Sequence, residues 1–119
     1  MAKDDYFVIV YKVLIYLYAV LKRKYVFNET ELIAALKIKD LSEDYFNDVI
    51  KMMYDDGLIT GLKYTKVWSG EYLLINELSN MKITPKGIEY LTDNSKMQSV
   101  KAFLIESADL FSKLFPLVF

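Results

Sequence analysis

The feature that most constrains this fold is a nearly uninterrupted apolar run close to the N-terminus, YFVIVYKVLIYLYAVL, from Tyr6 to Leu21. As a helix the run would be roughly 24 Å long at about 1.5 Å per residue, shorter than the ~30 Å hydrocarbon core of a bilayer. Lys12 lies in its middle, where a charge adds an insertion cost of about 2.5–3.5 kcal/mol. We therefore expect a helix buried inside the protein rather than a membrane span.

The spacing within this run supports the same interpretation. Apolar residues recur every three or four positions along one side, and a wetter stripe follows the other side. The apolar stripe contains Phe7, Val10, Leu14, Leu17 and Leu21, and the wetter stripe contains Asp5, Lys12, Tyr16, Ala19 and Arg23. The preceding MAKDD is acidic and no small-residue cleavage site follows, so no signal peptide is expected. We predict a cytoplasmic protein that does not associate with a membrane.

The middle of the chain carries the signals of two short helices joined by a tight connection. Asn28 is placed to cap the first helix, and Ser42 is placed to cap the second, which Gly57 ends. Two β-rich segments follow, LITGLKYT and EYLLI, with Ser69 and Gly70 in the turn between them. A hairpin directly after such a pair of helices is typical of a winged helix-turn-helix.

The whole chain of 119 residues is expected to form one α+β domain, a winged helix-turn-helix with additional N- and C-terminal helices. Residues 1–24 form the N-terminal helix, residues 25–93 the helix-turn-helix, wing and short helix, and residues 95–115 the C-terminal helix. A short strand is predicted at Tyr25 to Phe27. Thr84 and Pro85 begin the short helix, and the last helix is expected to run from Ser95 to about Leu114.

The composition argues against an enzyme. The chain has no histidine and no cysteine, so a zinc site would need carboxylates alone and a base active at neutral pH would need a strongly shifted pKa. No phosphate-binding, dinucleotide-binding or calcium-binding motif is present. We therefore predict no catalytic residue, no metal and no cofactor.

Three segments together resemble a known family. They are YKVLIYLYAVLK in the first helix, DYFNDVIKMMYDDGLITGLK through the second helix of the pair and the wing, and ITPKGIEYLTDNSKM before the last helix. The chain resembles the YjcQ-like family of small winged-helix proteins from Gram-positive bacteria and their phages. The resemblance spans about Tyr6 to Lys113 and implies a winged-helix domain of phage or prophage type. It carries over no catalytic or ligand-binding residues.

The helix that would read DNA in such a fold is acidic. Its outer face presents Asp44, Asn47, Asp48, Lys51 and Asp55, and Asn47 is a fair reader of adenine. At ~6 Å a carboxylate and a phosphate repel by roughly 0.7 kcal/mol in bulk water and by up to about 3 kcal/mol at an effective dielectric constant near 20. Two or three such pairs would cancel one good base contact. We interpret the carboxylates Asp44, Asp48 and Asp55 either as a solvated helix face or as a docking face for a basic protein partner.

The wing is the better candidate for contact with double-stranded DNA. Leu58 to Gly70 contains Lys63 and Lys66 and no carboxylate. Tyr64 or Trp68 would pack nearby, although packing against the sheet or capping of the wing is the favoured role of Trp68. Lys37 and Lys39 precede the acidic helix and could add to the same surface. Two lysines predict a salt slope of only about −1.8. The leading interpretation is a transcription-regulator-like protein that contacts DNA mainly through its wing, and the alternative is a module that docks a basic protein on its acidic helix.

A homodimer is expected to form through the first and last helices. The last helix has an apolar seam at heptad spacing, and the C-terminal FPLVF must either fold back or be buried in a partner. The candidate interface residues are Tyr11, Tyr18, Leu104, Phe111 and Phe115.

Overall fold

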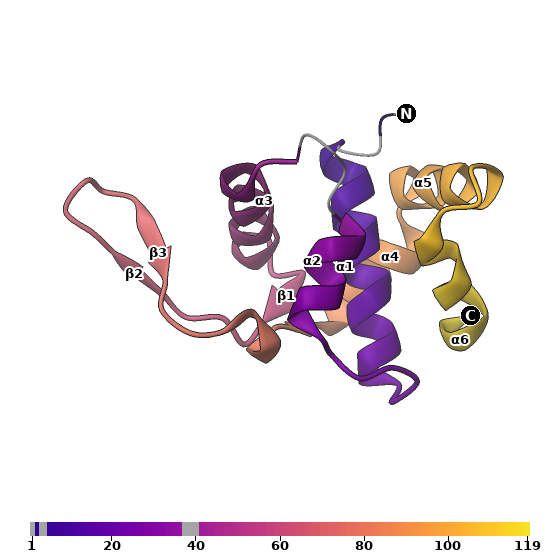
Figure 1. The fold of residues 1–119 in the computed structure, drawn as a ribbon, viewed down its shortest axis with the longest axis horizontal. Coiled ribbons are helices and arrows are strands. Elements are labelled where there is room, and N and C mark those ends of the chain that lie inside the picture. Colours follow the sequence, from indigo (N-terminus) through magenta and orange to yellow (C-terminus); the bar gives the residue numbers. More distant parts are fainter. Residues whose placement is uncertain (1, 3–4, 37–40) are drawn as a thin grey trace.

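A computed structural model of the chain describes residues 2, 5–36 and 41–119 (Figure 1). Its helices are α1 (Tyr6–Leu21), α2 (Glu29–Leu36), α3 (Glu43–Asp55), α4 (Pro85–Asp93), α5 (Ser95–Glu106) and α6 (Phe115–Val118), and its 3-10 turns are η1 (Leu78–Asn80) and η2 (Leu110–Leu114). The strands are β1 (Ile59–Thr60), β2 (Tyr64–Lys66), β3 (Tyr72–Leu74) and β4 (Lys82–Ile83). The protein is therefore α+β, as predicted, and the order of its elements is compatible with a winged helix.

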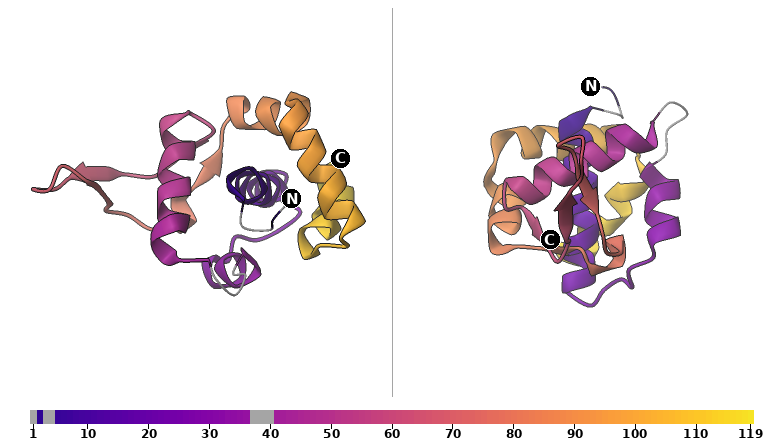
Figure 2. Two further views of the ribbon diagram at one scale, coloured as in Figure 1. Left: turned by 90° about the horizontal axis from the view of Figure 1, so that it is seen from above. Right: turned by 90° about the vertical axis from the view of Figure 1, so that its left-hand side faces the viewer.

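Helix α1 runs through the centre of the molecule, and the other helices surround it (Figure 2). Within the apolar stripe Val10, Leu14 and Leu17 are buried, whereas Phe7 and Leu21 near its ends are exposed. In the stripe expected to be wetter, Lys12, Tyr16 and Ala19 are buried as well. The prediction of a wetter stripe was therefore wrong for these three residues, because α2 and the C-terminal η2 and α6 cover the helix where solvent was expected, whereas Asp5 and Arg23 are exposed as predicted. Among the described residues, no helix has the length and apolarity needed to cross a membrane.

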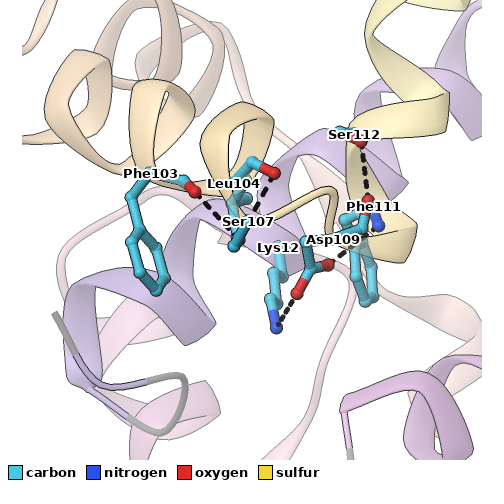
Figure 3. Close-up of polar contacts among 7 residues, drawn as sticks. All are labelled: Lys12, Phe103, Leu104, Ser107, Asp109, Phe111 and Ser112. Atoms are coloured by element: carbon cyan, nitrogen blue, oxygen red, sulfur yellow. Dashed lines mark hydrogen bonds and ion pairs between the residues drawn. The ribbon is translucent and has the colours of Figure 1, made fainter.

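The buried charge on Lys12 is matched by a carboxylate from the other end of the chain (Figure 3). Lys12 Nζ lies 3.3 Å from Asp109 Oδ2, and the two side chains are only 4 % and 7 % exposed. Asp109 Oδ1 accepts a hydrogen bond of 2.9 Å from the Phe111 N–H. The Lys12 ammonium also lies 5.4 Å from the centre of the Phe111 ring. The ion pair therefore joins the middle of α1 to the start of η2.

The chain reverses direction after α5, which differs from the continuous last helix that was predicted. Ala108 has a left-handed backbone with φ of 52°, and the Asp109 N–H returns to the Leu104 carbonyl at 3.0 Å. Beyond this turn, η2 and α6 fold back onto α1, and Lys22 donates a hydrogen bond of 2.6 Å to the Val118 carbonyl. Of the two fates expected for the apolar C-terminus, the structure shows that it folds back on its own chain.

The strands form two separate sheets rather than one. β1 pairs with β4 beside α1, and β2 pairs with β3 in a hairpin that projects from the body (Figure 1). The chain passes from the first sheet to the second at Gly61, whose φ is +90° and where a Cβ would lie 1.9 Å from the Asn80 carbonyl oxygen. Asn76 fixes the base of the hairpin by accepting from the Lys63 N–H and donating to the Gly61 carbonyl, each at 2.9 Å.

The strand predicted at Tyr25 to Phe27 is not formed, since this segment pairs with no other strand. Its contacts are made by Tyr16 instead. The Tyr16 hydroxyl accepts a hydrogen bond of 2.8 Å from the Asn28 N–H, and the Tyr16 ring meets the rings of Tyr25 and Phe27 edge to face. The segment is therefore an aromatic connection that leads from α1 into α2.

Candidate functional site

The described structure has an open groove bordered by α2, α3, β3 and η1. Its volume is about 1440 Å³, which exceeds the roughly 300–1,000 Å³ of a typical small-molecule pocket. The lining residues are Glu29, Ile33, Leu36, Leu41, Ser42, Glu43, Asp44, Phe46, Asn47, Asp48, Ile50, Lys51, Asp55, Tyr64, Glu71, Tyr72, Leu73, Leu74, Asn76, Glu77 and Leu78. We call it the α3–β3 groove. Its size and openness suit a segment of a macromolecule.

Helix α3 forms one wall of the groove as its sequence predicts. Ser42 caps the helix, and its side chain accepts a hydrogen bond of 3.0 Å from the Tyr45 N–H. The inner face is buried in the core and consists of Phe46, Val49, Ile50 and Met53. This packing turns the opposite face outward, so Asp44, Asn47, Asp48 and Asp55 are exposed and line the groove.

The groove is strongly acidic. Its described lining residues include seven carboxylates and one lysine. Three of these carboxylates come from outside α3, namely Glu29 at the start of α2, Glu71 in the hairpin and Glu77 before η1. Sequence reasoning missed these three because they are far apart in the chain and meet only after folding. Their shared signal, an exposed carboxylate next to a turn, is too common to identify a site.

Lys51, the one lysine among the described lining residues, is already paired with a carboxylate. Lys51 Nζ lies 2.5 Å from the Asp55 carboxylate and sits 4.6 Å from the ring centre of Tyr72 and 5.2 Å from that of Tyr64. Among the described lining residues, six carboxylates therefore have no cation of the lining paired to them. Because the charges share one concave surface, their fields add and favour a cationic ligand.

The bottom of the groove is apolar. Phe46 and Ile50 of α3 are buried beneath it together with Leu36 and Leu78, while Ile33 is half-buried at its side. Such a surface favours a ligand that has apolar side chains as well as positive charge. A purely ionic ligand would leave this surface in water.

The hairpin divides the basic patch that the sequence predicted. Tyr64 packs against Tyr54 of α3, with ring centres 5.1 Å apart, and burial raises its pKa to about 12, with smaller contributions from Asp55 and Tyr54. Since side chains alternate along a strand, Lys66 lies on the same face as Tyr64, whereas Lys63 lies on the opposite face. Both lysines are exposed, but they do not form one surface.

Trp68 is fully exposed, with a relative accessibility of 106 %, in the turn of the hairpin. It therefore packs against neither the sheet nor α3. Lys37 and Lys39, the other two predicted DNA contacts, lie outside the described residues. In the described part of the chain, no group of three or more acidic side chains is close enough to hold a metal ion.

A protein-family model described as "YjcQ protein" matches residues 11–109. The chain belongs to the YjcQ family. The resemblance inferred from the sequence is thereby confirmed, and the matched region of this YjcQ-family protein includes every residue of the α3–β3 groove and both members of the buried Lys12–Asp109 pair. Comparisons with curated proteins and with solved structures gave no match.

Four of the five residues predicted at a dimer interface are interior residues of this YjcQ-family fold. Tyr11, Leu104, Phe111 and Phe115 are between 0 % and 8 % exposed within the single chain. Their placement on the surface was therefore wrong, because α5 and the folded-back C-terminus, which carry the last three of them, pack against α1, which carries Tyr11. Tyr18 is half-buried and meets Phe119 edge to face at 6.5 Å.

Proposed function

We propose that this YjcQ-family protein is an interaction module of winged-helix type that binds a basic segment of a partner protein in the α3–β3 groove. The observation that carries the proposal is the charge of the groove together with its apolar bottom. Both belong to the surface that a winged helix would otherwise turn toward DNA, and that surface repels phosphate. The proposal assigns binding rather than catalysis to the chain, in a cytoplasmic protein of phage or prophage type.

Binding of double-stranded DNA through the hairpin is the second candidate. It is supported by the exposure of Lys63, Lys66 and Trp68 on an element that projects from the body. It is weakened by the separation of the two lysines on opposite faces, since only one of them would meet a given phosphate strand. The DNA candidate therefore predicts a small salt slope, of about −0.9 to −1.8.

The two candidates are separated by measuring two probes against the same variants. The first probe is a fluorescent peptide of alternating lysine and valine, and the second is a fluorescent random-sequence duplex in a salt series. Asp44→Asn with Asp48→Asn is expected to weaken peptide binding by roughly 2- to 30-fold, since each exposed ion pair contributes about 0.2–1 kcal/mol. The matched control is Glu89→Gln with Glu106→Gln, which removes two exposed charges outside the groove and should leave binding unchanged.

Two results would contradict the groove proposal. One is peptide binding that is equally weak in both pairs of variants. The other is binding of the duplex alone, with its loss in Lys63→Glu and Lys66→Glu, which would establish the DNA candidate instead.

Homodimerisation stays a prediction, but any interface must use residues other than the four interior ones, Tyr11, Leu104, Phe111 and Phe115. Exposed apolar side chains gather where the end of α1 meets the C-terminus, namely Leu21, Leu117 and Phe119. Light scattering at micromolar concentration tests the prediction, and a monomer there would refute it.

A further inference from the structure

We propose that the partner segment binds as an extended strand that adds to the free edge of β3. This inference rests on the proposed function, because it describes how the basic segment occupies the α3–β3 groove.

The hydrogen bonds of the hairpin define which backbone groups of β3 are free for such pairing. The Ile75 N–H donates to the Lys63 carbonyl at 2.8 Å, and the Val67 N–H donates to the Glu71 carbonyl at 2.9 Å. Bonded and non-bonded pairs alternate in an antiparallel ladder, so the pair Thr65–Leu73 between them is bonded. The N–H and C=O groups of Tyr72 and Leu74 therefore point away from β2.

This free edge belongs to the groove. Glu71, Tyr72, Leu73 and Leu74 all line it, whereas β2 contributes Tyr64 alone. In Figure 1, β3 lies on the side of the hairpin nearer to α3. A two-stranded sheet with an accessible edge is a template for pairing with another chain. An added strand would lie about 4.8 Å from β3, within the groove.

The two faces of the hairpin specify the side chains of the added strand. One face carries Tyr72, whose ring meets Lys51 of α3 at 4.6 Å, so the same face of a third strand would point toward the α3 carboxylates. The opposite face carries Leu73 and Ile75, each 58 % exposed, and a third strand would extend this apolar surface. The favoured partner is therefore a segment in which basic and apolar residues alternate.

Peptides test this binding mode directly. An alternating lysine–valine peptide about 8 residues long, a typical strand length, is compared with a peptide of the same composition at helical spacing. The alternating peptide is then N-methylated on one or the other set of alternate residues. Only one set of amides can face β3, so one methylated peptide should bind at least about tenfold more weakly, since each lost hydrogen bond changes affinity by roughly 2- to 13-fold. The other methylated peptide should bind as before.

A matched pair of variants tests the same contact from the side of the protein. Tyr72→Pro removes the outward N–H without removing a bond to β2, and proline is tolerated at such edge positions. Tyr72→Ala removes the same ring but keeps the N–H. We expect Tyr72→Pro to lose binding by at least about fivefold relative to Tyr72→Ala. Hydrogen exchange of the Tyr72 and Leu74 amides should slow when the peptide binds, and unchanged exchange at Leu73 in Tyr72→Pro verifies that the hairpin remains intact.

The possible failures are distinguishable. Strand addition would be overturned if peptides with alternating and helical spacing bound equally, or if the two methylation patterns had equal effects. If binding still depended on Asp44 and Asp48, the proposed binding of a basic segment in the groove would stand. Absence of binding by every basic peptide would overturn the proposed function and strand addition with it.

Discussion

Replacing Lys12 by methionine is expected to be among the most destabilising single changes in this protein. Methionine keeps the length of the side chain but removes its charge. The Asp109 carboxylate would then remain buried, with a side chain only 7 % exposed, and would keep the Phe111 N–H as a hydrogen-bond donor. Removal of one partner of a buried ion pair costs about 3–5 kcal/mol. Single domains have a total free energy of unfolding of about 5–15 kcal/mol, so Lys12→Met would lose a large share of it.

Urea unfolding followed by circular dichroism measures this loss as a lower midpoint at an unchanged slope. The decisive comparison is with Asp109→Asn and with the double variant. Asparagine keeps an oxygen for the Phe111 N–H, so the double variant removes both charges of the buried ion pair and retains the η2 contact. It is expected to be more stable than Lys12→Met alone.

Two results would refute this reasoning. One is a cost of less than about 1 kcal/mol for Lys12→Met, which would mean that water reaches the carboxylate. The other is a double variant whose cost equals the sum of the two single costs, since additivity would show that the two side chains do not interact. If Lys12→Met fails to fold, its rescue by addition of Asp109→Asn gives the same answer.

Three further predictions concern single side chains. Tyr11→Phe should raise the free energy of unfolding by about 1 kcal/mol in the same urea assay, because the Tyr11 hydroxyl is buried with no hydrogen-bond partner among the described residues. A loss of stability would show that the hydroxyl does have a hydrogen-bond partner. Gly87→Ala should cost about 1–3 kcal/mol by the same measurement, since the new Cβ would lie 2.2 Å from the Leu58 carbonyl oxygen, and an unchanged midpoint would contradict this close approach. The pKa of Tyr64, raised from 10.0 to about 12, makes the folded state hold a proton that the unfolded state loses above about pH 10, so stability should fall as pH rises through this window. Between about pH 9 and pH 11.5 the urea midpoint should fall less in Tyr64→Phe than in the unsubstituted protein. An identical fall in the two proteins would refute the raised pKa of Tyr64.

Local signals in the sequence predicted local structure well. Ser42 caps α3, and Thr84 accepts a hydrogen bond of 3.0 Å from the Gly87 N–H at the start of α4, with Pro85 in its first position. Gly57 adopts the left-handed conformation, with φ of 78°. Each of these features depends on contacts within a few residues, which are visible in a single stretch of sequence.

The two main failures, at α1 and at the last helix, involve contacts between distant segments. The stripe of α1 that contains Lys12 looked solvated because nothing in its own sequence reveals Asp109, which lies 97 positions later. The last helix looked continuous because its heptad pattern passes through Ala108, where a left-handed residue reverses the chain. The apolar residues after this turn serve to cover α1, and their pattern alone does not distinguish that role from a dimer interface.

The acidic groove results from how folding separates the charges of a nearly neutral chain. The net charge is only −1, yet the groove gathers seven carboxylates and one lysine, so the remainder of the chain carries an excess of positive charge. At physiological ionic strength the field of these carboxylates decays over about 8 Å, and they act on a ligand only once it has reached the groove mouth. Charges of this kind mainly set the orientation and the rate of association, whereas buried apolar contacts slow dissociation. A partner held in this groove must therefore supply both, with basic residues directed toward Asp44 and Asp48 and apolar ones that extend the surface of Leu73.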